Sequence, residues 1–310
     1  ADGVTREGKE AAWQDLGLLP RVLARTAGGH TRRTLLGREL AHPLLIAPVA
    51  TLRLAHPDGE IGMACAAAAQ QAGMVLSSQA STRLEDVAQA IVAEPGRGPL
   101  WMQLYLQPDR GFTQELVQRA EVAGYEALVL TVDAPVQGSR DEERRTGFQL
   151  PPDVSAVNLQ GQQAPVARPR QPGHSALFDD VLHHAPTWDD LAWLKAHTRM
   201  PILLKGVLHP DDATQARAEG ADGLIVSNHG GRTLDTAVST AWALPRIVEA
   251  VGTDWPVLVD GGLRRGTDVL KAIALGAHAV LIGRPAAQGL AAGGAAGVAQ
   301  TIRLLRDELE

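Results

Sequence analysis

Residues 219–232 read EGADGLIVSNHGGR, and this stretch contains the unit that repeats along the chain. A helix-like segment ends at Gly220, the apolar run Gly223–Val226 follows, and polar residues come directly after it. A glycine just past the last helical residue commonly closes a helix before the next strand. A short apolar run without alternation is typical of a strand that is buried on both faces of a parallel sheet. The stretch therefore predicts one helix–strand step of an α/β fold.

The same unit occurs eight times. Similar helix endings lie at Gly124 and Gly276. The predicted strands are Leu44–Ala47, Met74–Ser77, Leu100–Leu104, Ala127–Thr131, Ile202–Lys205, Gly223–Val226, Val257–Val259 and Ala279–Ile282. The predicted helices are Gly59–Ala72, Leu84–Ala93, Thr113–Ala123, Trp188–His197, Pro210–Glu219, Thr240–Val251, Gly266–Leu275 and Gly297–Leu309. Ser81 with Thr82, and Thr187, precede two of these helices as candidate N-caps.

Eight strand–helix pairs in about 270 residues predict an α/β protein of the (β/α)8 TIM-barrel type. A doubly wound sheet is the alternative. It usually has fewer strands and a Gly-x-Gly-x-x-Gly turn after the first strand, and no such turn follows residues 44–47 here. We therefore predict one barrel domain over residues 1–310.

Composition excludes several classes of protein. The chain has a net charge of −6 and no run of Lys and Arg, which argues against a nucleic-acid binder. No apolar run approaches the roughly 18 residues of a membrane span. The single cysteine, Cys65, lies in an alanine-rich run and is predicted to be a small core residue on a helix. We expect a cytoplasmic protein without a metal site.

One connection is much longer than the others. More than fifty residues separate Thr131 from Trp188, and the stretch Asn158–Pro172 is rich in Gln, Pro, Ala and Arg. A loop of this length in a compact domain is usually functional or disordered. We predict a partly flexible loop over residues 136–186, after the fourth strand, on the rim of the barrel.

The residues at the strand ends favour an active site on one rim, because active sites of such barrels lie at the C-terminal ends of the strands. These residues are Pro48, Val49, Ala50, Ser77, Gln103, Tyr105, Thr131, Asp133, Lys205, Ser227, Asn228, His229, Asp260, Gly283 and Arg284. His229 stands out among ten histidines because Arg232 shares its turn, which places a base beside an anion clamp. Asp133 is explained equally well as a cap of the turn before Pro135.

The last two strands predict a phosphate site. The turns Asp260–Arg264 and Gly283–Arg284 combine glycines with arginines. Barrels often bind phosphate with the loops after strands seven and eight. Two ordinary glycine turns with solvated arginines are the alternative.

With these residues in place, the chain resembles the FMN-dependent α-hydroxy acid oxidase and dehydrogenase family, which includes glycolate, lactate and hydroxymandelate oxidases and mandelate dehydrogenase. The matching stretches are Trp101–Tyr105, Thr131–Pro135, Ser227–Arg232 and Asp260–Ala272. The resemblance extends from Leu19 to the C-terminal helix.

The resemblance implies a role for each site residue. His229 would be the base, and Asp133 would steady its protonated form. Arg232 and Arg140 would hold the substrate carboxylate, and Tyr105 would hydrogen-bond the substrate. The cofactor FMN would contact Pro48, Val49, Ala50, Ser77, Gln103, Thr131, Lys205 and Ser227. Its ribityl chain and phosphate would contact Asp260, Gly262, Arg264, Gly283 and Arg284.

The implied reaction is oxidation of an (S)-2-hydroxy acid to the 2-oxo acid, with O2 as acceptor and H2O2 as product. Ala50 favours an oxidase, because dehydrogenases of the family often have glycine there. Gln79 stands where glycolate-oxidising members often have tryptophan, which favours a bulkier, mandelate-like acid. The family also implies a homotetramer. It implies a substrate-binding tyrosine in a segment before Ala1, so that terminal family segments are expected to be missing.

Three alternatives remain open at this point. The acceptor of the same oxidation could be a quinone or a cytochrome. The barrel could be an FMN-dependent isomerase, or it could be non-catalytic.

Overall fold

A closed barrel of eight parallel strands forms the centre of the molecule. The computed structural model describes residues 3–135, 141–162, 173, 175, 177–178, 182 and 185–310. The strands follow the order β10-β3-β4-β5-β6-β7-β8-β9 around the barrel. Their bounds are β3 Leu44–Ile46, β4 Gly73–Ser77, β5 Leu100–Leu104, β6 Leu128–Thr131, β7 Ile202–Val207, β8 Gly223–Val226, β9 Val257–Asp260 and β10 Ala279–Ile282. The predicted (β/α)8 barrel is confirmed, and each predicted strand is present to within two residues.

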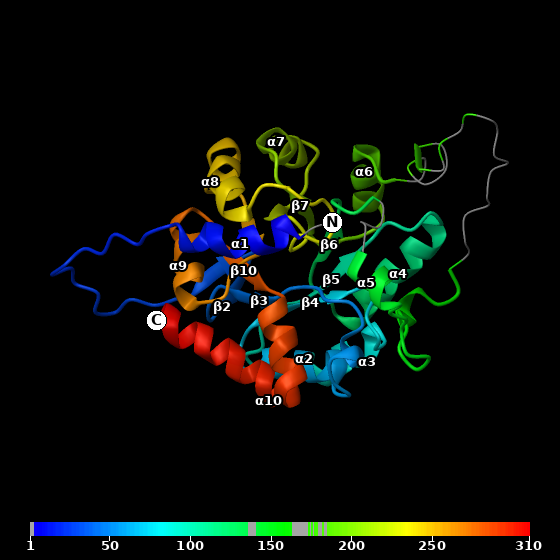
Figure 1. Cartoon of the computed structure of the whole chain (residues 1–310), viewed down its shortest axis with the longest axis horizontal. Helices are drawn as coiled ribbons and strands as arrows, with labels where there is room; N and C mark the ends of the chain where they lie inside the picture. The colour runs from blue at the N-terminus through cyan, green and yellow to red at the C-terminus, as the bar shows by residue number, and fades with distance from the viewer. Residues whose placement is uncertain are drawn as a thin grey trace.

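Helices surround the barrel (Figure 1). They are α1 Val4–Gln14, α2 Gly59–Ala69, α3 Leu84–Ile91, α4 Arg110–Ala123, α5 Asp141–Thr146, α6 Trp188–Ala196, α7 Pro210–Ala218, α8 Thr240–Val251, α9 Gly266–Ala274 and α10 Arg284–Leu309, with 3-10 turns η1 Leu52–Leu54 and η2 Val157–Leu159. The predicted last helix, Gly297–Leu309, corresponds to the second part of α10, and the first part, from Arg284, was not predicted. Gly293 and Gly294 interrupt its helical backbone, which hid the first half from a search for helical periodicity. Among the described helices, none is long and apolar enough to cross a bilayer.

A short antiparallel hairpin closes one end of the barrel. Its strands are β1 Arg33–Leu35 and β2 Arg38–Leu40, and neither was predicted. Leu36 and Gly37 connect them with φ values of 49° and 76°. Positive φ at both central residues is the requirement of a two-residue type I′ turn. Strands of three residues carry too little pattern to be recognised in the sequence.

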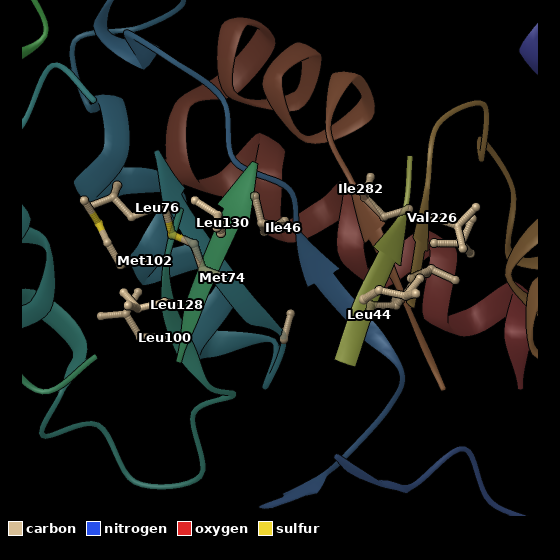
Figure 2. Close-up of a cluster of buried hydrophobic side chains, with 14 of the residues drawn as sticks. Leu44, Ile46, Met74, Leu76, Leu100, Met102, Leu128, Leu130, Val226 and Ile282 are labelled. Atoms are coloured by element: carbon tan, nitrogen blue, oxygen red, sulfur yellow. The ribbon is translucent and has the colours of Figure 1, made fainter. Parts of the chain in front are cut away.

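The core has two layers. The inner layer combines one or two apolar residues from every barrel strand with Leu35 and Leu40 of the hairpin. The outer layer packs the other face of the strands against the helices. Figure 2 shows part of this outer layer, including Leu44, Ile46, Met74, Leu76, Leu100, Met102, Leu128, Leu130, Val226 and Ile282. Strands buried on both faces explain why the sequence shows continuous apolar runs.

The inner layer determines which residues reach the barrel mouth. Its members include Val75, Trp101, Val129, Leu203, Ile225, Leu258 and Leu281. The residues two positions further along are Ser77, Gln103, Thr131, Lys205, Ser227, Asp260 and Gly283. Side chains two apart on a strand share a face. Seven strands therefore change from an apolar residue to a polar residue or glycine at the same end of the barrel.

Two sequence predictions about helices were wrong. Cys65 is exposed rather than buried, because it lies on the outer side of α2 while Ala64 and Ala66 face the core. An alanine-rich helix has no polar residues that mark its outer side. Ser81 and Thr82 do not cap α3 either: their hydroxyls donate to Glu60.

The long connection after β6 caps α3 instead. Asn158 is buried, its Oδ1 accepts from Leu84 N–H at 2.9 Å, and its Nδ2 donates to Thr82 O at 3.0 Å. The other predicted cap is confirmed, because Thr187 forms a capping box with Asp190 at the start of α6. Asn158 attaches one point of the rim loop firmly to the barrel.

A buried histidine lies just before β3. His42 is 1% exposed, its Nε2 donates to Gln70 O at 2.8 Å, and its Nδ1 accepts from Leu44 N–H at 3.3 Å. The bond that Nδ1 accepts needs the neutral ring, because a protonated Nδ1 has no free lone pair. Burial, assisted by Arg306, lowers the pKa of His42 to about 4, against the opposing effect of the Gln70 bond.

This histidine predicts a loss of stability in acid. Between pH 6.5 and pH 4 the unfolded chain binds a proton at His42 that the folded protein excludes, so stability falls as pH falls through this window. The contribution is about 3 kcal/mol. In urea titrations from pH 7 to pH 4, His42→Gln should flatten the decline by up to this amount. His278→Gln, at a half-buried ring that accepts from Val257 N–H, is the control. An unchanged slope in His42→Gln would contradict the assignment.

Candidate active site

Three side chains from three strand ends meet at the barrel mouth. His229 follows β8, Asp133 follows β6 and Tyr105 follows β5. Asp133 Oδ1 lies 2.8 Å from His229 Nδ1, and Tyr105 Oη lies 3.4 Å from His229 Nε2. A carboxylate at Nδ1 holds the proton on that nitrogen and leaves the Nε2 lone pair free to accept one. The arrangement is that of a general base, His229, supported by the carboxylate of Asp133.

The backbone of His229 is strained. Its φ is 54°, and Gly230 and Gly231 continue the left-handed turn with 63° and 75°. The His229 N–H donates to Ser227 Oγ at 3.1 Å. A non-glycine residue in this region costs free energy, and such residues cluster at functional sites. The turn directs the imidazole toward Asp133 and Tyr105.

Asp133 is positioned by close packing against Gly206 of β7. A Cβ at Gly206 would lie 2.4 Å from Asp133 Cβ and Cγ, and the φ of Gly206 is 110°. Only glycine permits this approach. The contact favours a function for Asp133 beyond capping the turn before Pro135.

Lys205 places a positive charge in the mouth. The residue is buried, its Nζ donates to Ser227 Oγ at 3.0 Å, and Asp260 Oδ2 lies 3.3 Å away. Burial alone would lower the pKa of Lys205, but Asp260, Asp133 and Tyr105 outweigh it and the net shift is upward. The side chain is therefore an ammonium ion.

A network of hydrogen-bonded polar side chains links the ends of β4, β5 and β6. Gln103 is buried, its Nε2 donates to Thr131 Oγ1 at 3.0 Å, and its Oε1 accepts from Ser77 Oγ and Ser78 N–H, both at 3.2 Å. These bonds fix the orientation of the amide. This network presents a row of donors and acceptors that suits the edge of a planar polar ring.

Glu60, which the sequence analysis missed, fixes the loops after β3 and β4. It is fully buried, and its Oε1 accepts from Leu52 N–H at 2.9 Å and from Ser81 N–H at 2.7 Å. Pro48, Val49 and Ala50 lie in the first loop, where Val49 is half-buried and Ala50 exposed. Thr51 N–H joins this loop to Gln79 O of the second at 3.1 Å. An acidic residue at the start of a helix is usually solvated, so no local pattern marked Glu60 as buried.

The two arginines expected to hold a carboxylate differ in outcome. Arg232 lies on the His229 turn, its side chain is half-exposed, and its Nη2 is 3.5 Å from Glu143 Oε1 of α5. Arg140 falls outside the described residues. The rim loop thus brings an acid, Glu143, to the guanidinium that the substrate is expected to use.

The predicted phosphate side is strongly positive. Arg284 is the first residue of α10, and the N–H groups in the first turn of a helix have no partner within the helix. Its guanidinium donates to Gly230 O. Burial and the neighbouring Arg264 and Arg232 lower the pKa of Arg284. Gly283 precedes it as the residue that caps the helix.

Helix α1, which was also missed, packs on this side. A Cβ at Gly262 would lie 2.3 Å from Lys9 O, so this glycine is needed for α1 to approach. Arg264 Nη2 lies 2.5 Å from Glu10 Oε1. Figure 1 shows α1 near α8 and α9, with which it is in contact.

The mouth fits a polar ligand with many hydroxyl groups. Among the described residues, the buried side-chain atoms without a hydrogen-bond partner include Ser78 Oγ, Asp133 Oδ2, Asn228 Oδ1 and Asp260 Oδ1, all at strand ends on this rim. A buried polar atom without a partner is costly. Four features of the mouth match the ring, ribityl chain and phosphate of FMN. They are the hydrogen bonds around Gln103, the Lys205 ammonium, the oxygens without a partner and the arginines.

Comparisons with known proteins agree with this geometry. The sequence model described as FMN-dependent dehydrogenase matches residues 1–310. An L-lactate oxidase of Roseobacter sp. (strain GAI101) is 51% identical, over 97% of this chain and 80% of its own length. A glycolate oxidase of Spinacia oleracea is 42% identical, over 94% of this chain and 78% of its own.

The solved structures give the same result. A mandelate oxidase crystallised with (S)-2-phenylpropionate superposes with a TM-score of 0.87 at 39% identity. The match covers 100% of this chain and 84% of the other. Another mandelate oxidase structure contains an FMN adduct. Since the family match spans the whole chain, the cofactor of this protein is FMN. The protein belongs to the FMN-dependent dehydrogenase family.

Proposed function

We propose that this protein oxidises an (S)-2-hydroxy acid to the 2-oxo acid and reduces O2 to H2O2. The observation that carries the proposal is the pair His229–Asp133, at 2.8 Å, beside Tyr105 and on the same turn as Arg232. A base next to a carboxylate clamp and a buried cation suits removal of a proton from a 2-hydroxy acid.

Substrate binding begins at Arg232. Its guanidinium binds the carboxylate through two parallel hydrogen bonds, and the family pattern adds Arg140 as a second carboxylate ligand. Tyr105 Oη donates to a substrate oxygen. Because Tyr105 Oη lies 3.4 Å from His229 Nε2, a group bound to the tyrosine lies within reach of the base.

His229 Nε2 then accepts a proton from the substrate. Asp133 stabilises the resulting imidazolium and holds its Nδ1–H in place. FMN, when bound, would supply the acceptor for the two electrons and for the second hydrogen of the substrate. The Lys205 ammonium stabilises negative charge that develops beside it in the mouth. Ser77, Gln103, Thr131 and Ser227 would orient the ring, and Asp260, Gly262, Arg264, Gly283 and Arg284 would hold the rest of the cofactor.

The relatives support O2 as acceptor, and Gln79 supports a substrate larger than glycolate. Those named above are oxidases of lactate, glycolate and mandelate. Ala50, which lies in the loop after β3, agrees with an oxidase. Gln79 in place of a tryptophan leaves more room for the side chain of the acid. We therefore propose a 2-hydroxy acid bulkier than glycolate, such as lactate or mandelate.

The test is an anaerobic screen of the holoenzyme. We expect (S)-lactate or (S)-mandelate to bleach the flavin faster than glycolate, and the (R) enantiomers to leave it oxidised. Mixing the reduced protein with air-saturated buffer should reoxidise it rapidly, with one H2O2 per 2-oxo acid. Slow reoxidation would show that O2 is not the acceptor and would favour a quinone or a cytochrome instead. No bleaching by any 2-hydroxy acid would overturn the proposed function in favour of an isomerase or a non-catalytic barrel.

A further inference from the structure

Lys9 of α1 is a buried cation that the proposed chemistry does not use. The residue is 3% exposed. Its Nζ donates to Arg6 O, one turn earlier in the same helix, and lies 3.7 Å from Glu10 Oε1. Buried lysines are rare unless they are paired with an acid. The pairing with Glu10 is loose, so it leaves the charge largely uncompensated.

Glu10 is shared with another cation. Its Oε1 lies 2.5 Å from Arg264 Nη2, much closer than to Lys9. Arg284 adds a third positive charge, and its effect together with burial lowers the pKa of Lys9 to about 8. Glu10 acts to raise the pKa of both Lys9 and Arg284. We call Lys9, Arg264 and Arg284 the cation cluster; with Glu10 it has a net charge of about +2, which a phosphate dianion would balance.

Packing ties Lys9 to the turn that follows β9. Its carbonyl oxygen lies 2.3 Å from where a Cβ of Gly262 would be, and Trp13 Nε1 donates to Gly261 O at 2.9 Å. The same turn contains Asp260 and Arg264. Lys9 is therefore attached by backbone contact to the loop that the proposed function assigns to the ribityl chain and phosphate.

We propose that Lys9 is a further ligand of the FMN phosphate, so that α1 forms one wall of the cofactor site. The inference rests on the assignment of Arg264 and Arg284 to the phosphate. In this arrangement FMN neutralises the cation cluster, and binding of FMN stabilises the contact of α1 with the barrel.

The test compares FMN with riboflavin, which lacks the phosphate, on the apoprotein. In Lys9→Met the Kd of FMN should rise roughly ten- to hundredfold, as for loss of one charge-assisted hydrogen bond. The Kd of riboflavin should stay within about twofold of the wild-type value. Lys9→Arg, which keeps the charge, should restore most of the preference for FMN. The apoprotein of Lys9→Met should melt no lower than wild type, because a buried uncompensated charge is removed.

Lys271→Met is the matched control. Lys271 donates to Trp13 O at 2.8 Å and so holds the end of α1 without belonging to the cation cluster. Its replacement should weaken FMN and riboflavin equally. If Lys9→Met also weakens both flavins equally and lowers the melting temperature, Lys9 only holds the helix and the inference is wrong.

Arg284→Met separates this inference from the proposed site. It should abolish most of the preference for FMN over riboflavin. If Arg284→Met does so and Lys9→Met does not, the phosphate site is correct and Lys9 is not part of it. If neither variant changes the preference, the phosphate lies elsewhere and the site assignment fails as well.

Discussion

His229→Asn is expected to slow reduction of the flavin by the preferred 2-hydroxy acid by about 10²- to 10⁴-fold. Asparagine can keep a hydrogen bond to Asp133, but its amide does not accept a proton at the position of Nε2. Binding of FMN should change little, because His229 is not among the residues assigned to FMN. The measurement is a single-turnover reaction under anaerobic conditions, followed by loss of flavin absorbance.

The control is His30→Asn, a substitution at an exposed histidine before the hairpin. It should reduce the flavin at the wild-type rate. Wild-type rates in His229→Asn, with every 2-hydroxy acid tried, would refute the assignment of the base.

Asp133→Asn should cause a loss of similar size, about 10²- to 10⁴-fold in the same reaction. With the contact of 2.8 Å preserved, an amide that donates to Nδ1 would force the ring proton onto Nε2 and leave no base facing the substrate. Substrate binding, which depends on Arg232, should change far less than the rate. Wild-type rates would mean that Asp133 only caps the turn before Pro135.

Gly206→Ala tests the same carboxylate by displacement. The new Cβ would lie 2.4 Å from Asp133 Cβ and Cγ, so the acid must move away while its charge is kept. The rate of flavin reduction should fall with it. Because the φ of 110° also strains alanine, a melting curve of each variant is needed to separate lost folding from lost positioning.

The sequence predicted the barrel and most of its mouth for one physical reason. Strands covered on both faces must be apolar throughout, so β5 and β8 were recognised with their bounds unchanged. At the end of each strand the inner face meets the ligand instead of the core, and a residue such as Gln103 or Lys205 breaks the apolar run. The residues at the end of each apolar run therefore indicate both where the strand ends and which side chains reach the barrel mouth.

The parts that the sequence did not predict depend on contacts between distant segments. The charges that surround Lys9 and Glu10 come from Arg264 and Arg284, more than 250 residues away in the sequence. Glu60 is buried only because the loops after β3 and β4 bring backbone N–H groups to it. None of these three residues lies in a local pattern that differs from an ordinary helix surface.

The position of α1 has a consequence for how the protein is made. Its anchors lie far along the chain: Thr5 N–H donates to Asp235 Oδ1 and Trp13 O accepts from Lys271. A ribosome that adds about 5–20 residues per second needs on the order of tens of seconds to reach them after α1 has emerged. During that interval the helix has no surface to dock on, and the indole of Trp13, fully buried in the finished protein, is exposed to water. Helix α1, which is made before the barrel strands, is thus among the last elements to dock.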